Sequence, residues 1–170
     1  VASGRPVYPR TLAPELVGLL ARQRAAGPRV DRYALPFAQA RRQLVEERLR
    51  GAWRQPPMHS IADESLQVAG RSVGLRWYRA KPGPGGGVPL VYLHGGGWCG
   101  GFNHTEQTVE RHLALASGMP VCGVDYSLAP EHPFPAAPED LHAVLDMLLA
   151  SYGSLVLAGD SAGANLALAE

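Results

Sequence analysis

Three short apolar runs, each followed by a turn and then by a helical pattern, constrain this fold more than any other feature. The apolar runs span 88–93, 119–124 and 155–158, and the helical patterns that follow them span 105–118, 139–151 and 162–170. Strands that alternate with helices predict parallel pairing with right-handed crossovers. Because the runs do not alternate between polar and apolar residues, both faces of the sheet should be buried by helices.

The chain before the first apolar run has other patterns. Apolar residues at helical spacing predict two amphipathic helices, over 12–26 and 37–49, and a proline-rich linker follows at 55–57. Two stretches with period-two alternation, 65–69 and 74–79, predict a β-hairpin. The sequence therefore predicts a helical N-terminal segment followed by an α/β unit.

The composition is that of a globular protein and sets few limits on partners. Hydrophobic residues make up 46% of the chain, charged residues 18%, and the net charge of +1 gives no reason to expect nucleic acid. Eleven arginines lie in residues 1–60, where they could contact an anionic partner, although a solvated helix face is the simpler interpretation. No apolar run approaches the about 18 residues of a membrane span, and residues 1–14 lack the apolar core of a secretory signal.

The cysteines favour a reducing compartment. Cys99 and Cys122 stand far apart and form neither a disulfide framework nor a metal-binding pattern. Disulfide-stabilised domains belong to oxidising compartments. We therefore expect a cytoplasmic protein.

A serine motif directly follows the third apolar run. It reads Gly159-Asp160-Ser161-Ala162-Gly163, and a helical pattern begins at Ala162. A serine on a tight strand-to-helix turn needs glycine neighbours, because side chains there would clash. This is the context of a nucleophile elbow, which raises the serine hydroxyl above the sheet. The motif alone also occurs by chance, so its flanking strand and helix carry the prediction that Ser161 is a nucleophile.

A glycine run follows the first apolar run in the corresponding position. It reads His94-Gly95-Gly96-Gly97-Trp98. Acyl transfer passes through a tetrahedral oxyanion, which preoriented N–H groups stabilise, and glycines let the backbone aim its amides at that charge. This motif after a strand is the form found in lipases and esterases. A phosphate-binding loop, the alternative, would require a lysine that does not follow here.

A proline-rich segment, 125–137, follows the second apolar run. It lies at the carboxyl end of a predicted parallel strand, where sites gather in open α/β sheets. Its first residue, Asp125, could either accept amides of the glycine loop or cap a helix. The residues alone leave these two roles open.

Together these three segments resemble the hormone-sensitive lipase family of α/β-hydrolases, also called bacterial esterase family IV. The family signatures are HGGGW, DYRLAPEHPFPAA and GDSAGGNLA, and this chain reads HGGGW, DYSLAPEHPFPAA and GDSAGANLA. The resemblance covers the whole chain in order, but only about the first half of a usual member. It implies an α/β-hydrolase fold with a mostly parallel sheet and helices on both faces. It also implies a helical cap segment over 1–57 and the N-terminal part of the catalytic domain over 58–170, with the C-terminal part of the fold missing.

The resemblance also implies roles for particular residues. Ser161 corresponds to the nucleophile. The backbone N–H groups of Gly96, Gly97 and Ala162 correspond to the oxyanion-hole donors, with Gly95 shaping the loop.

The chain departs from the family pattern in three ways. Ser127 replaces an arginine, so we expect no ion pair to anchor the 125–137 loop, and Ala164 replaces a glycine after the elbow. The family also places its catalytic aspartate and histidine well after the serine, and none of the nine residues after Ser161 is a histidine. We therefore expect residues 1–170 alone to be inactive as an esterase.

The resemblance implies a serine carboxylester hydrolase that acts on short to medium acyl esters through an acyl-enzyme. Its partner would be a small-molecule ester, without a cofactor, a metal, nucleic acid or a stable membrane anchor. A homo-oligomer or a complementing C-terminal segment is also possible. Two alternatives stay open: an amide or formamide hydrolase, and a non-catalytic ligand binder such as the gibberellin receptors of plants, which resemble the same family.

Overall fold

The computed structural model describes residues 12–25, 27, 31, 34–50, 55–82 and 87–170. The chain divides into two compact units, residues 1–35 and residues 36–170. The first unit contains helix α1 (Pro14–Ala25). The sequence predicts this helix over 12–26, and residue 26 lies outside the described residues. The second unit contains α2 (Phe37–Arg50) and the sheet. A cap segment over 1–57 and a catalytic part over 58–170 stay predictions.

The described residues of the second unit form a five-stranded sheet in the order β1-β2-β4-β3-β5. The predicted hairpin is formed by β1 (Ser60–Val68) and β2 (Arg71–Arg79), and β2 also pairs antiparallel with β4 (Val121–Asp125). Strand β3 (Leu90–Leu93) runs parallel to β4 on one side and to β5 (Val156–Gly159) on the other. The three apolar runs are thus the parallel strands, and their carboxyl ends meet at one edge of the sheet.

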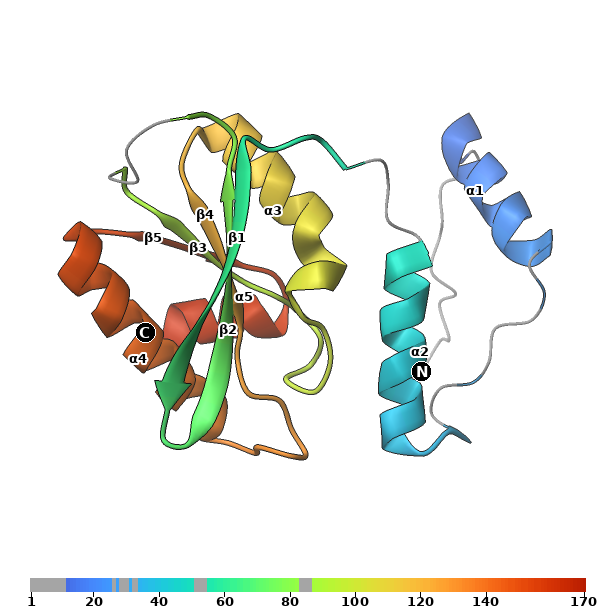
Figure 1. Ribbon diagram of the computed structural model, residues 1–170. Coiled ribbons are helices and arrows are strands. Elements are labelled where there is room, and N and C mark those ends of the chain that lie inside the picture. Colours follow the sequence, from blue (N-terminus) through green and yellow to red (C-terminus); the bar gives the residue numbers. More distant parts are fainter. Residues whose placement is uncertain (1–11, 26, 28–30, 32–33, 51–54, 83–86) are drawn as a thin grey trace, which may run out of the picture. The chain divides into compact units, whose positions relative to one another are not determined.

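Helices cover both faces of this sheet, as the apolar runs predict (Figure 1). Helix α3 (Asn103–Ser117) lies on one face, while α4 (Ala136–Tyr152) and α5 (Ala162–Ala169) lie on the other. Alternate residues of β3 point to opposite faces of the sheet. Val91 and Leu93 pack with residues of α4 and α5, whereas Leu90 and Tyr92 pack with residues of α3. Every residue of β3 is therefore buried.

The starts of two helices differ from the predicted positions by a few residues. Helix α4 begins at Ala136 rather than at 139. Pro138 fits in the first helical turn, because the N–H groups of that turn have no hydrogen-bond partner within the helix and proline lacks an N–H. Helix α3 begins at Asn103, whose N–H donates to Asp125 Oδ1 at 2.6 Å. Asp125 therefore caps a helix, which was one of its two possible roles.

A carboxyl group is buried between α3 and the sheet. Glu110 is fully buried, and neither of its oxygens has a hydrogen-bond partner among the described residues. Burial raises the pKa of Glu110 to about 8, and burial likewise raises the pKa of Asp125 to about 6. In both groups burial disfavours the charged form, because a charge there has lost its hydration.

This burial predicts that stability falls as the pH rises. Between the ordinary pKa of a glutamate, about 4.3, and the folded value of about 8, the folded chain binds more protons than the unfolded chain. Glu110→Gln removes this linkage. It should raise the free energy of unfolding by roughly 3–5 kcal/mol at pH 8 and change it little below about pH 4.5. Urea denaturation followed by circular dichroism across this pH range measures the difference.

Asp146→Asn is the control, because Asp146 is an exposed acid on α4. Its pH profile should parallel that of the unsubstituted chain. A Glu110→Gln profile that also stays parallel across the whole range would contradict the assignment of a raised pKa.

Candidate active site

Ser161 occupies a sharp turn between a strand and a helix. Strand β5 ends at Gly159, α5 begins at Ala162, and Ser161 has φ 49° and ψ −115°. A positive φ is unusual for a residue with a side chain, and such strained positions cluster at functional sites. Ser161 is exposed at this turn, so its hydroxyl is open to a ligand.

The turn lies directly against the end of β3, and this contact explains its two glycines. A Cβ atom on Gly163 would overlap the carbonyl oxygen of Leu93, and one on Gly159 would come within 2.8 Å of the same oxygen. Only glycine leaves room for the backbone to approach this closely. The contact places the loop that follows β3 beside Ser161.

That loop is a tight turn with unused amide donors. Gly96 and Gly97 have φ values of 143° and 63°, and the oxygen of Gly96 accepts the N–H groups of Cys99 and Gly100 at 3.3 and 3.0 Å. Within the described residues, the N–H groups of Gly96, Gly97 and Ala162 donate to no acceptor. These are the three amides that the resemblance implies as oxyanion donors, and that role stays a proposal.

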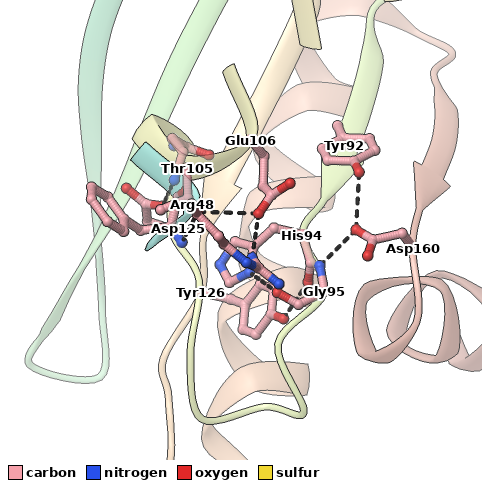
Figure 2. A network of polar contacts seen from close by, with 11 residues as sticks. Arg48, Tyr92, His94, Gly95, Thr105, Glu106, Asp125, Tyr126 and Asp160 are labelled. Atoms are coloured by element: carbon pink, nitrogen blue, oxygen red, sulfur yellow. Dashed lines mark hydrogen bonds and ion pairs between the residues drawn. The ribbon is translucent and has the colours of Figure 1, made fainter. Parts of the chain in front are cut away.

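Asp160 links the loop to the serine turn. Its Oδ1 atom accepts the N–H of Gly95 at 2.7 Å and the hydroxyl of Tyr92 at 2.9 Å, as Figure 2 shows. The N–H of Gly95 is thus engaged within the protein, which agrees with a loop-shaping role. The residue pattern suggested Asp125 for this contact and did not point to Asp160, although Asp160 directly precedes Ser161.

His94 is a structural part of the loop. It is 1% exposed, its ring stacks on Tyr126 with centroids 4.4 Å apart, and the Tyr126 hydroxyl donates to the His94 carbonyl at 2.6 Å (Figure 2). Burial lowers the pKa of His94, so the ring stays neutral. A buried, neutral ring of this kind supports the loop and is poorly placed to exchange protons with a substrate.

The proline-rich loop after β4 is anchored more firmly than the sequence predicts. Ser127 donates its N–H to Asp140 Oδ2 at 2.9 Å, and fully buried Asp140 also forms an ion pair with Arg71 at 2.8 Å. Glu131 forms a second ion pair, with Arg41 of α2, at 2.7 Å. The expectation that no ion pair anchors this loop is therefore wrong, because Arg41 pairs with Glu131 of the loop. The Arg71–Asp140 pair lies outside the loop and supports it through the Ser127 N–H.

An apolar cavity of about 460 Å³ lies next to the glycine loop. Gly97 and Trp98 line it on the loop side, Ala129 and Phe134 on the side of the proline-rich loop, and Leu166 on α5. It could hold the hydrocarbon part of a ligand. Among the described residues, no three His, Cys, Asp or Glu side chains gather as possible metal ligands.

Comparison with known proteins gives the same fold. Residues 90–170 match a family described as having the α/β-hydrolase fold. An ester hydrolase from the metagenome of Lake Arreo superimposes with a TM-score of 0.82 at 33% identity, over 94% of this chain and 54% of that chain. A hyperthermophilic esterase from the archaeon Pyrobaculum calidifontis gives 0.79 at 35% identity, over 92% and 51%. Ethyl acetate hydrolase of Pseudomonas putida is 34% identical over 85% of this chain and 48% of its own length.

Fold and motifs together define an α/β hydrolase with a serine elbow and a glycine loop. The resemblance of its three motifs to the hormone-sensitive lipase family, the bacterial esterase family IV, agrees with these matches. It spans about half the length of the solved structures it matches, and less than half the length of the curated relatives. None of the helices in the described ranges is long and apolar enough to cross a membrane.

The Asp160 link predicts a change in hydrogen exchange. Asp160→Ala removes the acceptor of the Gly95 N–H, whereas Tyr92→Phe removes only the other donor to the same carboxylate. A hydrogen bond to a charged group contributes about 1.5–3 kcal/mol, and less where the carboxylate is exposed, as here. The Gly95 amide should therefore exchange about tenfold faster in Asp160→Ala, with a smaller change in Tyr92→Phe.

Hydrogen exchange followed by NMR at the Gly95 amide measures both variants. Equal exchange rates in Asp160→Ala and the unsubstituted chain would show that the carboxylate does not hold the loop.

Proposed function

We propose that this protein is a serine carboxylester hydrolase in which the Ser161 hydroxyl attacks an ester carbonyl. The C–O bond to the alcohol then breaks, the alcohol leaves, and water releases the acid from the acyl-enzyme. The observation that carries this proposal is the strained position of Ser161 between β5 and α5, beside a glycine loop with free amides.

The oxyanion formed in this reaction would be stabilised by backbone N–H groups. Gly96 and Gly97 lie in the loop after β3, and Ala162 is the first residue of α5. Their amides are not used by other groups of the described chain, and the amino end of a helix favours negative charge. Donors that are already oriented lower the barrier without reorganising during the reaction.

Esters of short to medium acyl groups are the proposed substrates. The cavity beside Gly97 and Trp98 has an apolar lining and room for a short hydrocarbon chain. The relatives and solved neighbours named above are ester hydrolases, and one is named for ethyl acetate. This supports an ester rather than an amide substrate and favours catalysis over simple ligand binding.

Location and assembly are also proposals. Cys99 and Cys122 are free thiols, which supports a cytoplasmic location. A homo-oligomer or a complementing C-terminal segment stays a prediction.

The proposed function predicts covalent labelling of Ser161. A fluorophosphonate probe should react with the intact product of the gene, and Ser161→Ala should abolish that reaction together with p-nitrophenyl butyrate hydrolysis. The intact product is used because the family places the histidine base after the nucleophile. Mass spectrometry of the labelled peptide locates the adduct.

Ser151→Ala is the matched control, because Ser151 is an exposed serine on α4 whose hydroxyl donates only to the Met147 carbonyl. It should keep both labelling and turnover. Turnover that survives in Ser161→Ala would refute the proposed function.

A further inference from the structure

Helix α2 presents one face to the glycine loop and its neighbours. Arg41, Leu44 and Arg48 are spaced three and four residues apart, so their side chains lie on the same side of the helix. Arg41 donates from Nε to the carbonyl of Cys99 at 2.7 Å. A Cβ atom on Gly100 would lie 3.1 Å from Leu44, and Arg48 forms an ion pair with Glu106 at the start of α3 (Figure 2).

Arg41 joins two loops that follow different strands. Besides the Cys99 carbonyl in the glycine loop, it donates to the Ala129 carbonyl at 2.6 Å and to both carboxylate oxygens of Glu131 at 2.9 and 2.7 Å. Ala129 in turn donates its N–H to the Trp98 carbonyl at 2.9 Å. One planar guanidinium, with its donors in a rigid fork, thus holds the two loops in a single arrangement.

The two carbonyl contacts matter more for position than the ion pair does. Glu131 is exposed, and exposed ion pairs contribute little to stability. The contacts with the Cys99 and Ala129 carbonyls are partly buried and fix backbone groups directly. Because the Cys99 N–H donates to the Gly96 carbonyl, a fixed Cys99 also restrains the peptide groups of Gly96 and Gly97.

We propose that Arg41 is a positioning residue through which α2 holds the glycine loop in the orientation that its amides need to stabilise the oxyanion. This inference rests on the proposed function. It gives α2 a role in the reaction step. Arg41 does not line the cavity beside the glycine loop, so its effect should fall on transition-state stabilisation and leave substrate binding unchanged.

The test compares Arg41→Met with Arg42→Met in the intact product of the gene. Arg42 is the exposed neighbour on the same helix and carries the same charge. With p-nitrophenyl butyrate, Arg41→Met should lower kcat about tenfold with KM unchanged, because misaligned donors lose part of their effect. Its affinity for a trifluoromethyl ketone, which mimics the tetrahedral oxyanion, should fall by about the same factor. Arg42→Met should change neither quantity.

Two further variants separate positioning from charge and from folding. Glu131→Gln keeps both carbonyl contacts of Arg41 and should lower kcat by no more than about twofold. Arg41→Lys keeps the charge but loses the fork that reaches both loops, so it should lower kcat severalfold. It serves as the test variant if Arg41→Met does not fold.

The outcomes of this test distinguish the two proposals. If Arg41→Met, or Arg41→Lys in its place, matches Arg42→Met in kcat and ketone affinity while Ser161→Ala is inactive, the positioning role is overturned and the proposed function stands. If Ser161→Ala remains active, the proposed function fails, and this inference fails with it.

Discussion

The close contact between the end of β3 and the turn at Ser161 is the constraint on which the rest of the site depends. Gly159 and Gly163 have no space for a side chain, because both lie against the Leu93 carbonyl. This contact sets the serine turn beside the loop that begins at His94. The parallel pairing of β3 with β4 and β5 brings the carboxyl ends of these three strands together beside it.

The glycine loop would be free to adopt many conformations without support, because glycine restricts the backbone so little. It is held from opposite ends of its sequence. Asp160 accepts the Gly95 N–H at the start of the loop, and Arg41 donates to the Cys99 carbonyl near its end. The peptide groups between these two contacts keep free N–H donors, which is the arrangement that electrostatic stabilisation of an oxyanion requires.

The sequence predicted the parts of this site that depend on local patterns. Apolar runs placed the parallel strands, and the motif around Ser161 lies between a strand and a helix as expected. The strand order and the contacts of Arg41 depend on residues far apart in the chain, and no local pattern encodes them. For the same reason Asp125 was open to two roles, since only the fold shows that it caps α3 while Asp160 contacts the loop. Helix starts shifted by a few residues because first-turn positions tolerate proline and polar residues.

The central claim is that Ser161 and the amides of Gly96, Gly97 and Ala162 act on the same carbonyl group. A crystal structure of the intact product of the gene, after reaction with an alkyl fluorophosphonate, tests this claim most directly. We expect phosphorus bonded to Ser161 Oγ, with one phosphoryl oxygen about 2.7–3.1 Å from at least two of these amide nitrogens. An adduct on another residue, or a phosphoryl oxygen that points away from the glycine loop, would contradict it.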